Sequence, residues 1–117
     1  GHHAHVVQPI ELVEGTPVVW GLGNQLANQA QVPRSDGLLA RVTMTEGADG
    51  RFTASGIEAV PTWVDTAGGF RVYPASADDV DPAVGPGLRQ VLQASWDRTA
   101  AVLGTTPTGG VSLAPRP

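Results

Sequence analysis

The stretch that decides the fold is LLARVTMT, residues 38–45. Its apolar side chains stand at positions 38, 40, 42 and 44, and mostly polar ones stand between them. This period of two predicts a β-strand with one buried apolar face. The glycine-rich segment at residues 46–50 has the length of a hairpin connection. We therefore expect a second strand to return over residues 51–64.

The returning strand carries two irregularities. Its alternation begins with Phe52 and Ala54 and slips at Gly56, which predicts a bulge or bend there. Pro61 has no backbone N–H to donate to a neighbouring strand, so we expect the end of this strand to lie at a sheet edge. A further short strand is predicted at residues 70–73.

The segments before the hairpin indicate short strands and loops. Residues 6–11 are either a short strand or the start of an irregular segment, because Pro9 argues against a central strand. Residues 14–17 have the composition of a turn and precede a short apolar strand at residues 18–20. The polar stretch at residues 25–36 is expected to be a loop.

A helix is expected from Pro86 to Gly104, because proline near the first helical position and glycine just past the end are the usual asymmetry. One face of this helix carries a mainly apolar stripe at helical spacing. Its members are Leu88, Val91, Leu92, Ser95, Trp96, Thr99, Val102 and Leu103. Strands followed by one helix predict an α+β fold, or one layer of a larger sandwich.

Two further segments are interpreted as solvent-facing. The acidic residues Asp78, Asp79 and Asp81 are interpreted as a solvated surface and not as a metal site, since no histidine accompanies them. Residues 105–117, which are rich in proline and glycine, are expected to form a flexible tail.

The composition excludes several classes of protein. The chain has 117 residues, no cysteine and a formal net charge of −4. Without cysteine it has neither a disulfide framework nor a cysteine zinc site. No apolar run approaches the ~20 residues of a membrane span. The acidic balance disfavours nucleic acid as a partner.

All three histidines lie within the first five residues, as His2, His3 and His5. Side chains two residues apart in an extended or loop segment point to the same side, so His3 and His5 can face one metal ion or two adjacent ions. Neutral imidazole is a common ligand of zinc, iron and manganese. The pattern alone does not distinguish a metal site from the remnant of a purification tag.

The residues around these histidines resemble a family motif. GHHAHVVQPIE, residues 1–11, resembles the last metal motif of the CapA-type capsule, or poly-γ-glutamate, biosynthesis proteins, whose pattern is Gly-x-His-Pro-His-Val-x-Gln. It departs at Ala4, where proline is usual. A second block, PVVWGLGN at residues 17–24, resembles the family's apolar strand ending in Ser-Leu-Gly-Asn, with Gly21 in place of serine. The resemblance covers residues 1–74 well.

This resemblance implies the calcineurin-like metallophosphoesterase superfamily. It implies that residues 1–104 are the C-terminal part of a four-layer α/β/β/α sandwich, and that His3 and His5 are ligands of a site with two divalent ions of manganese, iron or zinc. In the superfamily the two ions clamp a phosphate-like oxygen and lower the pKa of an attacking water.

The resemblance also implies which residues lie near that site. His2 stands where the superfamily has glycine and is assigned no metal. Gln8 and Asn24 match family positions close to the site, and capping of a tight turn is the equally weighted alternative. Gly23 is expected to provide a backbone conformation that is closed to other residues.

The other ligand motifs of the superfamily do not occur in the sequence: an Asp with a His two residues on, a Gly-Asp and a Gly-Asn-His. We therefore expect a C-terminal segment that needs the N-terminal part of the same domain as its partner and is inactive alone. If complete, the resemblance implies a metal-dependent hydrolase acting on a phosphoester or an anionic polymer. The implied role is synthesis or export of poly-γ-glutamate capsule at the cell envelope or outside the cell.

The alternative is a non-catalytic, β-rich binding or structural module with a histidine-bearing N-terminus. A sugar-stacking surface would need exposed aromatic rings, and Trp20, Trp63 and Trp96 are the candidates. Because they lie on strand-like runs and on the apolar stripe of the helix, we expect all three to pack in the core.

Overall fold

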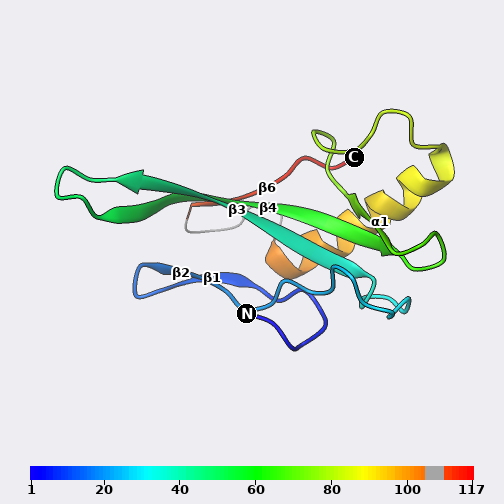
Figure 1. Ribbon diagram of the computed structural model, residues 1–117, viewed down its shortest axis with the longest axis horizontal. Helices are drawn as coiled ribbons and strands as arrows, with labels where there is room; N and C mark the ends of the chain where they lie inside the picture. Colours follow the sequence, from blue (N-terminus) through cyan, green and yellow to red (C-terminus); the bar gives the residue numbers. More distant parts are fainter. Residues whose placement is uncertain (105–109) are drawn as a thin grey trace.

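The structure is a computed structural model that describes residues 1–104 and 110–117. It consists of a long β-hairpin with a helix at its base and a short second hairpin beside its middle (Figure 1). The elements in chain order are β1 (Ile10–Val13), β2 (Thr16–Val19), β3 (Asp36–Glu46), β4 (Phe52–Asp65), β5 (Arg71–Pro74), α1 (Pro86–Leu103) and β6 (Val111–Leu113). The predicted order of strands followed by a helix, and with it the α+β class, is confirmed; the sheet then gains one more strand after the helix.

The long hairpin is formed by β3 and β4, which pair antiparallel from Asp36 opposite Trp63 to Glu46 opposite Phe52. Their register shifts once, between Thr43 and Met44. Thr43 faces Gly56 and Met44 faces Ala54, so one residue of β4 has no partner at this point. The predicted bulge is confirmed, because the extra residue directly precedes Gly56.

β4 is the central strand of the four-stranded sheet. β3 lies along one side, and the other side is shared by β6, which pairs with residues 57–59, and β5, which pairs with residues 62–65. The prediction that Pro61 marks a sheet edge is therefore wrong. Pro61 lies where the neighbour changes from β6 to β5. Its carbonyl accepts from the N–H of Ala75 at 2.7 Å. A backbone N–H at this position would point to the same side, where β6 ends and β5 begins.

The structure differs from the expected flexible tail. Val111–Leu113 forms β6 and pairs parallel to β4, and the Ala114 N–H extends this contact by donating to the Ala59 carbonyl at 2.9 Å. The apolar side chains of Val111 and Leu113 pack on the core, a pairing that local composition does not reveal. Residues 105–109 of the expected tail lie outside the described residues.

The buried apolar face predicted for residues 38–45 exists only at the base of the hairpin. Leu38 is 1% exposed, whereas Val42 is 47% and Met44 is 52% exposed. The core around Leu38 is built with Val7, Ile57, Ala59 and Val111, and Ile10, Leu22 and Leu103 pack against it. The tip of the hairpin extends beyond these elements (Figure 1), so its apolar face has nothing to pack against among the described residues.

The helix prediction is confirmed at both ends. α1 begins at Pro86 and is closed by Gly104, whose φ is +83° and whose N–H donates to the Ala100 carbonyl at 2.8 Å. The buried residues are Leu92, Ser95, Thr99 and Ala100. Val91 and Val102 of the predicted stripe are instead exposed, because the sheet is narrow and covers only the centre of that face.

The tryptophan prediction holds for two of the three residues. Trp63 and Trp96 pack against the second core, which is built from Ala75, Val80 and Leu92. Trp20 is 47% exposed and donates its Nε1–H to Glu11 Oε2 at 2.6 Å. The prediction for Trp20 is therefore wrong, because it follows the last residue of β2 and lies outside both cores.

Candidate metal site

The segment that carries the histidines, residues 1–11, is hydrogen-bonded to residues 17–24, the second block that resembles the family. The Gln8 N–H donates to the Gly21 carbonyl at 3.0 Å, and the Trp20 N–H donates to the Pro9 carbonyl at 3.2 Å. Val7 is buried in the core and forms an isolated bridge with Leu22. Two blocks that are separate in sequence therefore lie side by side. The histidines lie between two points of contact, because the Gly1 carbonyl also accepts from the Leu22 N–H at 3.4 Å.

His3 and His5 lie close together, as their spacing predicts. Their ring centres are 6.5 Å apart and the ring planes are inclined by 43°. Both side chains are exposed, and so is His2. His3 and His5 have φ values of +84° and +60°, the left-handed region that non-glycine residues seldom adopt. The segment is thus held in a conformation that presents both imidazoles on the surface.

Asn24 contacts one member of this pair, His5, directly. Its Oδ1 lies 2.9 Å from His5 Nδ1. Its Nδ2 lies 2.8 Å from the carbonyl oxygen of Arg34, 3.2 Å from Gln29 Oε1 and 3.3 Å from the carbonyl oxygen of His5, and its two hydrogens are shared among these acceptors. Asn24 is 6% exposed. It therefore ties the loop over residues 25–36 to the histidine segment. These contacts are of the kind that the capping interpretation describes, and the place of Asn24 near a metal site stays a prediction.

Gly23 has the backbone conformation that the sequence predicts. Its φ is +66°, and a Cβ at this position would lie 2.6 Å from the carbonyl oxygen of Asp36. Gly23 forms an isolated bridge with Gly37, next to the first residue of β3. Glycine is needed here for two reasons, the left-handed φ and the close approach of another backbone.

Gln8 lies over Gly21, the position where serine is common in the resembled family. A Cβ on Gly21 would lie 2.7 Å from Gln8 Oε1 and 3.0 Å from Gln8 Cγ. The side chain of Gln8 thus occupies the space that a serine would need. Gln8 and the segment before it pack against this block, without a contact to either imidazole among those described.

Sequence reasoning assigned no role to Gly1, Gln29 or Arg34. A Cβ on Gly1 would lie 2.1 Å from the carbonyl oxygen of Trp20, so the first glycine of the motif is required by a close backbone approach. Its place in the motif is a signal that could have identified it. Gln29 and Arg34 orient Asn24 through the contacts above, and nothing in the composition of their loop distinguishes them.

The acidic run lies in a different part of the structure. Asp79 forms an ion pair with Arg41 of β3, which also pairs with Glu58 at 2.8 Å. The interpretation of this run as a solvated surface is corrected for Asp79, whose side chain is 23% exposed. Asp81 accepts from the Ala83 N–H at 2.9 Å within its own loop.

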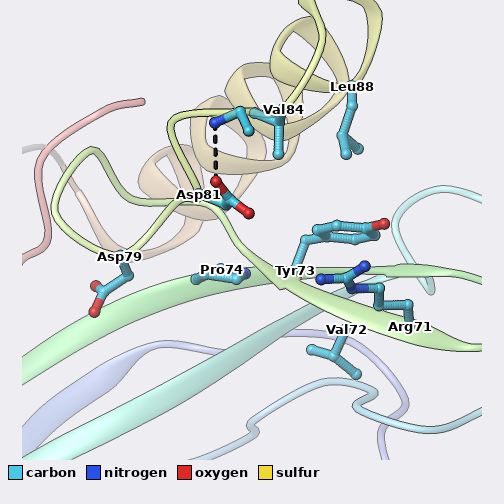
Figure 2. Close-up of a pocket in the computed structure, with 9 residues that line it drawn as sticks. Arg71, Val72, Tyr73, Pro74, Asp79, Asp81, Val84 and Leu88 are labelled. Atoms are coloured by element: carbon cyan, nitrogen blue, oxygen red, sulfur yellow. Dashed lines mark hydrogen bonds between the residues drawn. The ribbon is translucent and has the colours of Figure 1, made fainter.

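A cavity of about 410 Å³ lies between β5 and this acidic loop (Figure 2). It is lined by Arg71, whose guanidinium lies 4.9 Å from the ring centre of Tyr73, and by Asp79, Asp81 and Leu88. Across residues 1–104 and 110–117, no group of three or more histidine, cysteine, aspartate or glutamate side chains could hold a metal ion. Within that same part of the chain, no helix has the length and apolar character needed to span a membrane.

Comparison with known proteins gives a family match and a match to a curated relative. The model of the bacterial capsule synthesis protein family PGA_cap matches residues 1–29. The PGA biosynthesis protein CapA of Bacillus subtilis (strain 168) is 34% identical over 58 residues, which is 50% of this chain and 15% of that protein. The chain thus spans only a small share of the curated relative's length. No solved structure matches it. Residues 1–29 therefore resemble the bacterial capsule synthesis protein family, and the chain is CapA-like over the part that matches.

Proposed function

We propose that this chain supplies His3 and His5 as ligands to a two-metal, metallophosphoesterase-like site in a protein of poly-γ-glutamate capsule synthesis or export. The observation that carries the proposal is the exposed pair of imidazoles, 6.5 Å apart, within the segment that matches the family model. The unusual φ values of both residues support it, because backbone strain is concentrated at functional sites.

The spacing of the two rings supports neighbouring ions over a single shared ion. Nitrogen–metal bonds of 2.0–2.1 Å place the centres of two imidazoles on one tetrahedral ion about 5 Å apart. The observed 6.5 Å is wider. One imidazole on each of two ions, which in two-metal sites stand about 3.5–4 Å apart, accommodates this separation.

Two imidazoles do not complete such a site. We propose that the remaining ligands come from an N-terminal part of the same domain, which is consistent with the 15% of the curated relative that the match covers. When bound, the ions would stabilise the negative charge on a phosphate-like oxygen and lower the pKa of a bound water molecule. The substrate would be a phosphoester or an anionic polymer, and the site would act at the cell envelope or outside the cell.

The test is zinc binding to the full-length protein, which is this chain together with the N-terminal part, followed by ring-¹⁵N chemical shifts of His2, His3 and His5. We expect saturable shifts of His3 and His5 and loss of saturation in His3→Ala and in His5→Ala. His2→Ala is the matched control, because it removes an exposed histidine of the same segment and should leave the affinity unchanged. Equal losses in all three variants, or no saturable binding in the unaltered full-length protein, would refute the ligand assignment and favour the non-catalytic binding module.

A further inference from the structure

We infer that Asn24 is a positioning residue for His5: it holds the His5 proton on Nδ1 and leaves Nε2 as the nitrogen available to a metal ion. That Nε2 binds a metal ion rests on the proposed function. The orientation of Asn24 and the tautomer of His5 do not rest on it, because they follow from contacts within the chain alone.

The first step is the orientation of the Asn24 amide. Two of the acceptors near its Nδ2 are backbone carbonyl oxygens, of Arg34 at 2.8 Å and of His5 at 3.3 Å. A carbonyl oxygen only accepts hydrogen bonds, so the atom that faces these two groups must be the NH₂ end of the amide. The other end, the acceptor Oδ1, therefore faces the imidazole of His5 at 2.9 Å.

The second step is the tautomer of His5. Because Oδ1 of Asn24 only accepts, the hydrogen bond exists only if His5 Nδ1 carries the proton and donates it. A neutral imidazole has one N–H, so Nε2 then keeps its lone pair. The nitrogen that binds a metal is set in this way by the hydrogen bond that the other nitrogen makes.

The third step is the rigidity of Asn24. Its side chain is 6% exposed. Its backbone N–H donates to the Asp36 carbonyl at 3.2 Å, and the Leu38 N–H donates to the Leu22 carbonyl at 2.8 Å beside it. The amide is thus anchored to the first residues of β3, and an exposed imidazole is oriented by a buried group. Such an outer hydrogen-bond partner typically changes metal affinity about 10–100-fold when it is removed.

The experiment reads the tautomer without any metal. Ring-¹⁵N shifts and two-bond N–H couplings are recorded at about pH 8.5, two units above the ordinary histidine pKa of about 6.5. In the unaltered chain we expect His5 to be protonated on Nδ1. In Asn24→Ala we expect a mixture of both tautomers. A proton on Nε2 in the unaltered chain would overturn the inference, whatever the variants do.

Two further variants separate positioning from structural support. Gln29→Ala removes one acceptor of the Asn24 amide but leaves Oδ1 on His5, so the tautomer should persist. Asn24→Asp places a carboxylate oxygen against the Arg34 carbonyl and should cost stability, yet it keeps an acceptor for Nδ1–H and should keep the tautomer. If Asn24→Ala retains the slow exchange of the Leu38 amide and also retains a pure Nδ1–H tautomer, Asn24 does not position His5.

Zinc affinity, measured on the full-length protein that contains this chain and the N-terminal part, then distinguishes this inference from the proposed function. We expect Asn24→Ala to bind zinc about 10–100-fold more weakly than the unaltered chain. An unaltered chain with the expected tautomer but no saturable zinc binding would refute the metal site and leave the orientation of His5 by Asn24 intact. Zinc binding with the proton on Nε2 would refute the inference and leave the metal site intact.

Discussion

Arg98 of α1 forms a bidentate ion pair with Asp36, the first residue of β3. Arg98 Nε lies 2.6 Å from Asp36 Oδ2, and Nη2 lies 2.8 Å from Oδ1. The Asp36 side chain is 3% exposed and that of Arg98 is 31% exposed. Ser95, one turn earlier on the helix, also donates to Asp36 Oδ1 at 2.8 Å. The hydrogen bond to Asp36 raises the pKa of Arg98, and the pair fixes the helix to the strand that supports Asn24.

Replacing Arg98→Met should destabilise the fold by about 3 kcal/mol. Breaking a buried pair costs about 3–5 kcal/mol because a buried charge is left without a partner, and the partial exposure of Arg98 places the change at the low end. The measurement is urea unfolding. Arg51→Met is the matched control, because Arg51 lies 3.8 Å from Asp49 in a fully exposed pair and should change stability by less than about 0.5 kcal/mol. Equal losses of stability in the two variants would show that buried Asp36 does not need Arg98 as its charge partner.

Gly23→Ala should cost more than Gly50→Ala, although both glycines have positive φ values, of +66° and +75°. A left-handed alanine costs roughly 1–2 kcal/mol at either position. At Gly23 the added Cβ would also meet the Asp36 carbonyl oxygen at 2.6 Å, whereas nothing lies within 4 Å at Gly50. Crowding adds roughly 1–3 kcal/mol. Thermal unfolding of the two variants compares them, and a difference below about 0.5 kcal/mol would show that the contact is easily relieved.

Ile57→Ala and Val42→Ala should differ although these residues face each other across the hairpin. Ile57 is 4% exposed and Val42 is 47% exposed. Truncation of the buried side chain should cost about 2–5 kcal/mol, because it leaves a cavity. Truncation of the exposed Val42 side chain should cost under about 1 kcal/mol. Denaturant midpoints give both values. A large loss at Val42 would indicate that the apolar tip face is covered in solution.

The carboxyl group of Asp97, which pairs with Arg116, should titrate at low pH. Arg116 donates to both carboxylate oxygens of Asp97, at 2.7 and 2.8 Å, and these hydrogen bonds hold the pKa of Asp97 below its ordinary 3.8. The folded pKa is lowered, so the stabilisation is present above about pH 4 and is lost as the pH falls through the folded pKa.

Carboxyl ¹³C titration of Asp97 provides the measurement. Arg116→Gln should raise the midpoint towards 3.8, and Arg51→Gln should leave it unchanged. A midpoint that is unaffected by Arg116→Gln would mean that the pair does not form in solution.

Local sequence signals predicted the elements whose determinants are local. The helix from Pro86 is bounded by a proline and by Gly104, and the bulge beside Gly56 follows from a break in alternation. The candidate site was predicted because His3, His5, Gln8, Gly23 and Asn24 stand in two short blocks that resemble motifs of the capsule synthesis family. The helix and the bulge depend on backbone preference and residue spacing, both of which can be read without knowledge of distant contacts.

Long-range contacts decided the rest. The sequence by itself determined the hairpin, the helix and the histidine pair, because each depends on residues that are close along the chain. Only the tertiary structure decided that Val111–Leu113 completes the sheet, that Pro61 lies in the central strand and that the apolar face ends before Val42. It also decided that the Asn24 amide meets the His5 ring. Burial and hydrogen-bond partners are properties of surfaces brought together in space, so no local pattern specifies them.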